Sequence, residues 1–355
     1  MKDRVYVCHT FYHVYVSVIK ELNRLPEDRK GATILLSTMS NDFGDLKDRL
    51  IGSGLFDEVY MYEEKVPEFF PELKKYSKDR GNLVLNLLQR IVYTKKLGRL
   101  EEKYLPVDMK EYKDIYVYCD SDPVAYYLSY RHIYYHAVED GLDCIRYLDN
   151  ARYSNRGHFE LKAWMAAHNI IFIDGGYAKY CLDMEVNDTS VIKYRHSKYK
   201  EVNREALVNG VSPEDIHYLV DIFIENAEEL LEATGNVPGS VKKIMILSDP
   251  VCDEDTRARL MRDIVDRYAV GARVFIKPHP RDKVDYHGLF EDCVVIRGRF
   301  PMEIMNYIPQ MHMDAIVSIL TPLDEIKFAD EKILLGRDFM DFYEEPAIHR
   351  QNEVI

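Results

Sequence analysis

Residues 274–281 read V-F-I-K-P-H-P-R, and the interpretation of the rest of the chain starts from this stretch. Residues 274–276 form a short apolar run of the kind that makes a buried strand. Pro278 and Pro280 end the run, because proline cannot continue a sheet ladder and pushes the preceding residue into an extended conformation. His279 is therefore predicted to stand between two stiff residues at the carboxyl end of a strand.

That position suits chemistry on an anionic ligand. In open α/β sheets, ligands bind at the carboxyl ends of the strands. A histidine can donate a proton near neutral pH, and the neighbouring Lys277 and Arg281 add positive charge beside it. A surface turn with an ordinary histidine explains the same residues. The choice between this alternative and a functional histidine therefore depends on the remaining motifs.

The composition is that of a globular protein with room for two domains. The chain has 355 residues, of which 47% are hydrophobic and 30% charged. Two domains of ordinary size fit this length. The formal net charge of -13 argues against a nucleic-acid-binding protein, which is expected to carry a basic face.

No segment has the pattern of an export signal or a membrane span. The six cysteines are scattered and include no C-x-x-C pair, which favours reduced thiols over disulfides or a zinc site. The N-terminus M-K-D-R-V-Y-V-C-H lacks the apolar region of a signal peptide. No run approaches the roughly 20 apolar residues that span a bilayer. We therefore expect a cytoplasmic protein.

Strand and helix patterns alternate from the N-terminus onward. A strand at residues 5–8 leads through a polar turn into a helix over 11–22, which is how many doubly wound sheets begin. Further strands are predicted at 33–37, 58–62, 115–119 and 133–138, and helices at 45–51, 69–76 and 83–100.

The alternation restarts in the second half of the chain. A long helix is predicted over residues 213–234, and the stretch 235–240, rich in glycine and proline, is typical of a linker. We therefore predict an α/β protein with two Rossmann-like domains, residues 1–234 and 241–355, facing a central cleft. The strands of the second domain are predicted at 244–247, 274–276, 294–296, 315–317 and 333–335.

An acidic motif, Glu139-Asp140-Gly141, follows the strand predicted at 133–138. Two adjacent acids repel each other, which can raise the pKa of one of them. A carboxylate so placed can accept a proton from a sugar hydroxyl. The sequence does not decide which of the two carboxylates faces the cleft, and E-D-G is also a common turn.

A second acidic motif, Asp120-Ser121-Asp122-Pro123, follows the strand at 115–119. In many sugar transferases a D-x-D sequence holds a divalent metal against a nucleotide diphosphate. Asp122 and Pro123 also make a good helix start, with aspartate as the N-cap and proline in the first turn. We favour this structural interpretation and expect no metal site.

The helix predicted over residues 83–100 is apolar at its start and carries Arg90, Lys95, Lys96 and Arg99. A basic amphipathic helix can lie on an anionic membrane surface. A helix packed on the sheet with a solvated basic edge fits the same pattern.

Polar side chains follow several strands of the second half. Hydroxyls and backbone N–H groups suit a phosphate, and a glutamate can accept hydrogen bonds from two ribose hydroxyls. No G-x-G-x-x-G or Walker A sequence is present, which disfavours dinucleotide and P-loop binding. The residues that could together bind one nucleotide are Lys277, His279, Glu303, Ser318 and Thr321.

With these motifs, the chain resembles the bacterial sialyltransferases of the GT-B type. The similarity is closest to glycosyltransferase family 52, with relatives among the capsule polysialyltransferases. These families share an acidic motif, an H-P motif and a later Ser/Thr motif, matched here by Glu139-Asp140-Gly141, His279-Pro280, and Ser318 with Thr321. The opening V-Y-V-C-H-T-F-Y-H also resembles the N-terminus of family 52. The last motif departs from the paired serines of some relatives.

The resemblance implies a GT-B fold. Residues 1–234 would face the acceptor, residues 241–355 would bind CMP, and C-terminal helices can cross back to the first domain. It also implies that sialic acid is transferred, with inversion, from CMP-sialic acid to a sugar hydroxyl. The acceptor would be a galactose-containing or sialylated glycan of the bacterial surface, in lipooligosaccharide or capsule. A peripheral contact with the inner membrane surface is compatible with that acceptor.

The same resemblance implies roles for individual residues. Glu139, or alternatively Asp140, would deprotonate the acceptor hydroxyl, and His279 would protonate the departing phosphate. Because CMP leaves as a monophosphate, one acid and hydroxyl or backbone donors suffice, and no cofactor is expected. The residues implied to bind the substrate are Lys277, Pro280, Glu303, Ser318 and Thr321.

Two other functions remain open. The first is a metal-dependent transferase that uses a UDP-sugar through Asp120 and Asp122. The second is a non-catalytic protein that binds sugars or nucleotides, in which the motifs are only turns.

Overall fold

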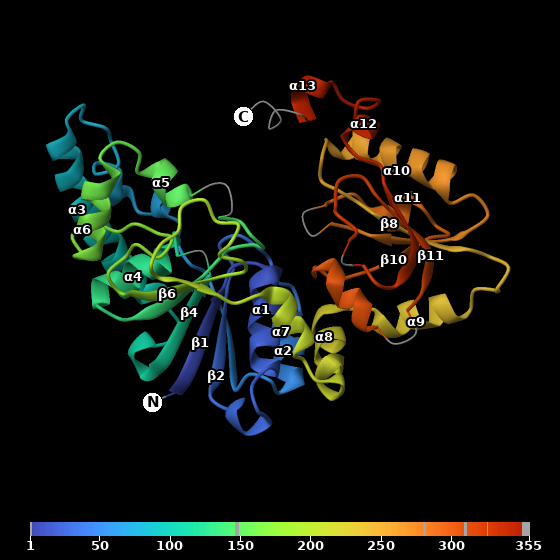
Figure 1. The fold of residues 1–355 in the computed structure, drawn as a ribbon, viewed down its shortest axis with the longest axis horizontal. Helices are drawn as coiled ribbons and strands as arrows, with labels where there is room; N and C mark the ends of the chain where they lie inside the picture. The colour runs from blue at the N-terminus through green and yellow to red at the C-terminus, as the bar shows by residue number, and fades with distance from the viewer. Residues whose placement is uncertain are drawn as a thin grey trace. The chain divides into compact units, whose positions relative to one another are not determined.

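The computed structural model describes residues 2–118, 120–145, 149–279, 282–308, 311–324 and 326–349. The chain divides into two compact units, Met1–Asp215 and Ile216–Ile355. Figure 1 shows that each unit is a sheet flanked by helices. Among the described residues, no helix combines the length and apolar character needed to cross a membrane.

The first unit is built on a seven-stranded sheet of order β3-β2-β1-β4-β5-β6-β7. All neighbours are parallel, and β1 pairs with both β2 and β4. The order reverses at this pair, and ligands of such sheets bind at the carboxyl ends of the strands on either side of the reversal. The strands are Lys2–Cys8 (β1), Ala32–Ser37 (β2), Glu58–Tyr62 (β3), Tyr112–Tyr118 (β4), Tyr135–Val138 (β5), Cys181–Val186 (β6) and Tyr199–Glu201 (β7).

Helix α1 (Phe11–Leu22) has the bounds that the sequence predicts. The Thr10 hydroxyl accepts a hydrogen bond from the His13 N–H at 3.2 Å and so caps the helix. The helix is buried along most of its length, which fixes the turn between β1 and α1. The other helices of this unit are Leu46–Ser53 (α2), Leu83–Glu101 (α3), Pro123–Arg131 (α4), Asn150–Ser154 (α5), Phe159–Ala167 (α6) and Arg204–Asn209 (α7).

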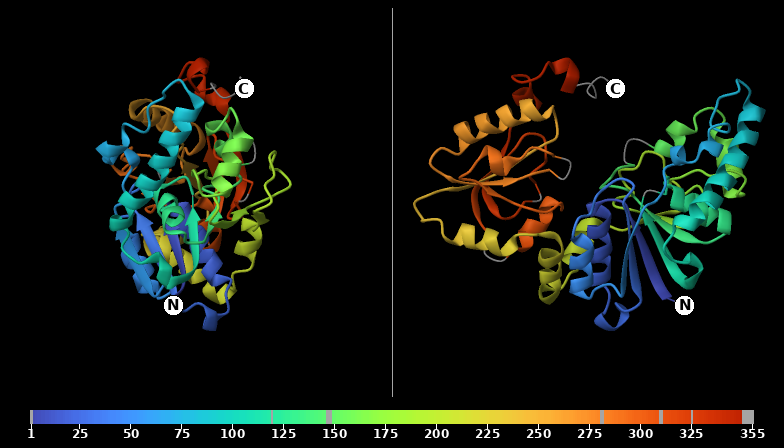
Figure 2. Two further views of the ribbon diagram at one scale, coloured as in Figure 1. Left: turned by 90° about the vertical axis from the view of Figure 1, so that its left-hand side faces the viewer. Right: turned by 180° about the vertical axis from the view of Figure 1, so that it is seen from behind.

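Helix α3 is held closely against its neighbours. A Cβ atom on Gly98 would lie only 2.4 Å from the carbonyl oxygen of Tyr126 in α4, so this crossing requires glycine. Leu87 and Ile91 of α3 pack into a cluster with Met165 of α6. The two helices run side by side in Figures 1 and 2.

The second unit carries a five-stranded sheet of order β10-β9-β8-β11-β12, again with all neighbours parallel. The α/β fold class and the Rossmann-like winding of both halves are therefore as predicted. The strands are Lys243–Leu247 (β8), Arg273–Lys277 (β9), Val294–Val295 (β10), Met313–Ser318 (β11) and Ala329–Leu334 (β12). The helices are Ile216–Phe223 (α8), Ala227–Gly235 (α9), Glu254–Tyr268 (α10), Tyr286–Leu289 (α11), Arg337–Met340 (α12) and Pro346–His349 (α13).

The prediction of a helix over residues 69–76 is wrong. The chain there forms two short 3-10 helices, Pro67–Phe69 and Pro71–Leu73. Proline in a helix interior removes one N–H donor and clashes with the preceding turn. Pro71 therefore breaks the helix that the apolar pattern suggested.

The prediction of one helix over residues 213–234 is also wrong, because α8 and α9 are separate. The break includes Asn226, whose side chain donates to the Val295 carbonyl at 3.2 Å and accepts from the Arg297 N–H at 2.9 Å. These bonds tie the break to the end of β10. Both helices consequently belong to the second unit, and the two units divide after Asp215 rather than at the linker 235–240.

Candidate active site

Polar side chains collect at the carboxyl edge of the first sheet, the edge where parallel α/β sheets bind ligands. They come from the ends of five neighbouring strands, so they share one edge although the sequence separates them widely. These residues are His9 after β1, Ser37 at the end of β2, Glu64 after β3, Asp120 after β4, and Glu139 with Asp140 after β5.

Glu64 joins most of these segments. Its buried carboxylate lies 2.6 Å from the His9 Nε2 atom. It also accepts hydrogen bonds from the Ser37 hydroxyl at 2.9 Å, the Tyr62 hydroxyl at 3.1 Å and the Val124 N–H at 2.7 Å. One carboxylate thus connects the ends of the first three strands with the N-terminus of α4.

The charge of this pair is set by its surroundings. Burial alone would lower the pKa of His9, but the adjacent Glu64 carboxylate raises it to about 9. Burial alone would raise the pKa of Glu64, but the His9 charge and the hydrogen bonds hold it below its ordinary value. At neutral pH, the two residues therefore form a buried imidazolium–carboxylate pair.

A second histidine transmits this arrangement to the acidic motif. The His9 N–H donates to His13 Nδ1 at 3.0 Å, so this nitrogen carries no proton. The Nε2–H of His13 can then donate to the backbone oxygen and to the Oδ1 of Asp140, both at 2.9 Å. Burial lowers the pKa of His13, which keeps the ring neutral and its tautomer fixed.

The two acids of the motif have opposite properties. The Asp140 side chain is 54% exposed, and its hydrogen bond from His13 lowers its pKa. Glu139 is only 1% exposed, and its Oε1 accepts the Asn187 N–H at 2.6 Å. Burial raises the pKa of Glu139 to about 7, against the opposing effect of Arg204. Oε2 of Glu139 has no hydrogen-bond partner among the described residues.

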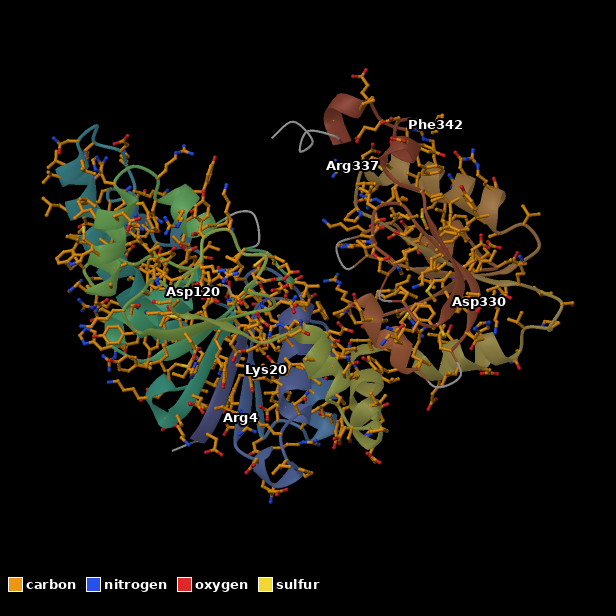
Figure 3. The ribbon with its side chains drawn as sticks, in the orientation of Figure 1. Arg4, Lys20, Asp120, Asp330, Arg337 and Phe342 are labelled. Atoms are coloured by element: carbon orange, nitrogen blue, oxygen red, sulfur yellow. The ribbon has the colours of Figure 1, made fainter. Side chains whose placement is uncertain are left out.

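The first acid of the D-x-D sequence has a structural role. Asp120, labelled in Figure 3, is buried at the end of β4. Its carboxylate accepts hydrogen bonds from the Gly175 N–H at 2.7 Å, and from the Gly176 N–H and the Tyr135 hydroxyl at 3.3 Å. Burial, together with the charge of Asp174, raises the pKa of Asp120 to about 7. The carboxylate of Asp120 is therefore already engaged in hydrogen bonds with other groups of the protein.

The second acid occupies the predicted N-cap position of α4. Its side chain makes no capping hydrogen bond there, because Glu64 takes the N–H of Val124 instead. The carboxylate of Asp122 lies 3.4 Å from His9 Nε2. Neither Asp120 nor Asp122 belongs to a three-residue group able to hold a metal ion within the part of the chain that the structure describes.

In the second unit, a network of hydrogen bonds fixes the loop that carries His279. The His279 N–H donates to the Ser248 hydroxyl at 2.9 Å, and that hydroxyl donates to Asp282 at 2.5 Å. Asp282 also accepts from Arg257 at 2.6 Å and from the Tyr286 hydroxyl at 2.7 Å. The Asp282 N–H closes the loop on the His279 carbonyl at 2.8 Å. Sequence reasoning missed Ser248 and Asp282, although Ser248 directly follows a strand.

Lys277 lies under this loop and is buried. Its amine donates to the carbonyls of Pro278 at 3.1 Å and Gly298 at 3.2 Å, and lies 4.1 Å from the ring centroid of Phe300. Burial lowers its pKa to about 7. Lys277 therefore stabilises the turn after β9. Pro280, the next residue expected at this site, lies outside the described residues, as does Arg281.

Ser318 and Thr321 both contact the carboxylate of Asp249, an acid to which the sequence analysis gave no role. The Thr321 hydroxyl donates to Asp249 at 2.5 Å, and the Leu320 N–H donates to the same carboxylate at 2.9 Å. The Ser318 hydroxyl lies 3.4 Å from it. Asp249 thus holds the loop after β11. Glu303 is in the first turn of the 3-10 helix Met302–Tyr307.

The pattern that defines glycosyltransferase family 52 matches residues 77–318. The chain belongs to glycosyltransferase family 52. The match includes the acidic motif, the H-P motif and Glu303, and it ends at Ser318. An uncharacterized protein of Haemophilus influenzae is 25% identical over 130 residues, which cover 31% of this chain and 42% of that protein.

Solved structures with a similar fold include a 2,6-sialyltransferase from a Photobacterium species, in a ternary complex with the donor product CMP and the acceptor substrate lactose. It superposes with a TM-score of 0.54 at 9% identity, over 93% of this chain and 71% of that one. An α/β-galactoside α-2,3-sialyltransferase from Photobacterium phosphoreum superposes with a TM-score of 0.49 at 12% identity, over 93% and 89% of the two chains. The first similarity confirms the GT-B fold.

The role of Glu64 can be tested by removing its charge. Glu64→Gln leaves the buried His9 with only the Asp122 carboxylate, 3.4 Å from its Nε2 atom, and removing one partner of a buried pair costs about 3–5 kcal/mol of unfolding free energy. Because the folded-state pKa of His9 is raised from 6.5 to about 9, the stabilisation is complete below pH 6.5 and is lost as the pH rises through 9. In urea unfolding, the unfolding free energy of Glu64→Gln should be well below that of the wild type at pH 6, and the difference between the two proteins should be smaller at pH 9.5.

Glu63→Gln is the matched control, since the Glu63 side chain is 72% exposed. It should change the unfolding free energy by less than about 1 kcal/mol. Equal unfolding curves for the two variants at pH 6 would contradict the importance given to Glu64.

Proposed function

We propose that this chain is an inverting sialyltransferase that moves sialic acid from CMP-sialic acid to a hydroxyl of a bacterial surface glycan. The proposal is supported most by the acidic motif, where a carboxyl group with a pKa of about 7 stands at the ligand-binding edge of the first sheet. Membership of family 52 supplies the reaction class. A structure of the same fold was solved with CMP and lactose, which points to this donor and to a galactoside acceptor.

We assign the general base to Glu139. A base works best when its pKa lies near the working pH, and burial brings Glu139 to about 7. Oε2 of Glu139 has no hydrogen-bond partner among the described residues but is buried, so the acceptor hydroxyl would pass its proton to this atom only after displacing the atoms that cover it. Asp140 has the more exposed carboxylate but a lowered pKa, so it would contact the acceptor. The reverse assignment of the two acids is the alternative.

His279 would act on the leaving group. Its backbone is anchored on both sides by Ser248 and Asp282, and as an imidazolium it would give its proton to the departing CMP phosphate. Lys277, with its pKa lowered to about 7 by burial, would be pulled toward the charged state by an arriving phosphate. It would then stabilise the negative charge that develops on the leaving group.

The remaining contacts with the donor would come from the second unit, Ile216–Ile355, which includes the predicted nucleotide domain, residues 241–355. Glu303 would accept hydrogen bonds from the ribose hydroxyls. Ser318 and Thr321 would shape the phosphate site through a loop whose position Asp249 fixes. Pro280 would keep His279 extended. The first unit would hold the acceptor glycan.

The alternative of a metal-dependent UDP-sugar transferase has less support. Its metal ligands would be Asp120 and Asp122, but the carboxylate of Asp120 already accepts three hydrogen bonds from the protein. The alternative of a non-catalytic sugar- or nucleotide-binding protein does not account for a carboxyl pKa near 7 beside a fixed pair of histidines.

We further propose a cytoplasmic enzyme that lies peripherally on the inner membrane, where a lipooligosaccharide or capsule acceptor would be assembled. Helix α3 supports this, since Val84 and Leu88 are 63% and 54% exposed, and Trp164 of the neighbouring α6 is 55% exposed. Lys78 and Arg80 precede the helix. Apolar side chains beside basic ones suit an anionic lipid surface.

Three substitutions test the assigned chemistry. Glu139→Gln removes the proton acceptor without changing its shape and should lower the rate of CMP release with acceptor by about 10²–10⁴. His279→Ala should lose a similar factor, whereas His287→Ala, on the exposed face of α11, should leave the rate unchanged. Asp140→Asn should affect acceptor KM more than kcat. Full activity of both Glu139→Gln and His279→Ala would overturn the proposal.

The pH profile separates the two acids. If Glu139 is the base, kcat/KM should fall as the pH drops below about 7, because the carboxyl then holds its proton. An acid limb below 3.8 would instead assign the base to Asp140, whose pKa is lowered from that value. Loss of the acid limb in Glu139→Gln would confirm the first assignment.

Sedimentation with lipid vesicles tests the membrane position. The chain should pellet with vesicles that contain anionic lipid and remain in solution with purely zwitterionic ones, and Leu88→Glu should weaken the binding. A chain that never pellets with anionic vesicles would contradict this part of the proposal.

A further inference from the structure

Arg204 is a buried cation to which the proposed chemistry gives no role. It is the first residue of α7 and is only 5% exposed. Its Nη1 donates to the Val202 carbonyl at 2.9 Å. A guanidinium keeps its proton in proteins, so Arg204 places a positive charge inside the first unit. Such a charge is costly to bury unless a negative group offsets it.

The other edge of the Arg204 guanidinium has no hydrogen-bond partner in the part of the chain that the structure describes. Its Nε and Nη2 atoms are both buried there. The planar guanidinium can bind a carboxylate through two parallel N–H donors of this kind. Two more buried atoms lack a partner within the same ranges, namely Oε2 of Glu139 and the hydroxyl of Tyr12. Buried polar groups normally have partners, so these complementary donors and acceptors indicate a functional cluster.

Asn187, directly after β6, links the backbone of Arg204 to Glu139. The Asn187 N–H donates to Oε1 of Glu139 at 2.6 Å, and its side-chain oxygen accepts from the Arg204 N–H at 2.8 Å. Its side-chain amide also donates to Asp143 at 3.0 Å, in the loop after the acidic motif. The Glu139 N–H donates to the Glu185 carbonyl at 3.0 Å. One asparagine therefore fixes the start of α7 and the acidic motif relative to each other.

The groups around Glu139 have opposing effects on its charge. Burial raises the pKa of Glu139, and the positive charge of Arg204 opposes this rise more than any other group does. The charge of Asp143 adds to the rise. Burial raises the pKa of Tyr12, in α1, to about 12, so its phenol keeps a proton and can donate it in a hydrogen bond. The other titratable groups on which Glu139 or Arg204 acts are Cys144, Lys20 and Tyr118.

We propose that Arg204 is a positioning residue of the active site, whose buried guanidinium keeps the Glu139 carboxylate ionised and in place to accept a proton. The proposal rests on the proposed transferase function, in which Glu139 is the base. Because Arg204 is covered by the protein, it would act through Glu139 rather than on the substrates. Without this cation, the buried Glu139 carboxyl would hold its own proton at neutral pH and could not accept another.

A carbon NMR titration of the full chain, labelled at the glutamate carboxyl carbons, follows the charge of Glu139 without any turnover. The signal of Glu139 is the one that Glu139→Gln removes. Its midpoint should lie at about pH 7 in the wild type. In Arg204→Met, and in Arg204→Gln as a second neutral variant, the midpoint should rise by about 1–3 pH units. Arg204→Lys keeps the positive charge and should restore a midpoint close to that of the wild type.

Arg195→Met is the matched control, because it removes the same charge from an exposed position of the same unit. Both the midpoint of Glu139 and the rate of CMP release should stay as in the wild type.

The rate of CMP release with acceptor is the second readout. Relative to the wild type, the two neutral variants should be slower by about 5–500-fold at pH 7, as the rise of the midpoint implies. The loss should be smaller at pH 9, where more of Glu139 is ionised. A purely structural role of Arg204 would lower the rate by the same factor at both pH values.

The two readouts separate this proposal from the transferase function. A protein in which the midpoint moves as expected, but which releases no CMP, would contradict the transferase function and leave the effect of Arg204 on Glu139 supported. Unchanged midpoints in Arg204→Met and Arg204→Gln, or an equal loss of rate at pH 7 and pH 9, would overturn the role of Arg204.

Discussion

The buried Glu64 carboxylate is the constraint on which the first half of the site depends. It pairs with His9 at 2.6 Å and receives donors from three further segments. Taking such a charge out of water is expensive, and only the full set of partners offsets that cost. The same pair fixes the backbone of His9, whose N–H sets the tautomer of His13 and so the hydrogen bond to Asp140. A residue four strand positions away in the sheet thereby orients the acidic motif.

In the second unit, two consecutive residues position the loops that carry the functional groups. Ser248 bonds to the loop that carries His279, and Asp249 bonds to the loop that carries Thr321. Both residues directly follow β8, the central strand of the sheet. One short connection therefore places the loops of two neighbouring strands. In each unit, buried charged or polar groups at the carboxyl edge of the sheet determine where the functional groups stand.

Most of the fold could be predicted from the sequence, because apolar runs of strand length alternate with helical patterns. Strands β6 and β7 escaped notice since Cys181–Val186 mixes two acids with apolar residues and Tyr199–Glu201 is only three residues long. The break at Asn226 depends on bonds to residues about 70 positions later, which no local pattern reveals. His279 and the acidic motif stood out because unusual neighbours mark them. Glu64, Asp249 and Asp282 did not, since their importance comes from partners far away in sequence.

The central claim is that groups of the chain itself transfer sialic acid from CMP-sialic acid. It is tested most directly by incubating the full chain with CMP-sialic acid and lactose in the presence of EDTA and following the products by NMR. The account predicts free CMP and a sialylated lactose whose new glycosidic bond has the opposite anomeric configuration to that of the donor. A product with retained configuration, or transfer that occurs only from a UDP-sugar with added Mg²⁺, would contradict it.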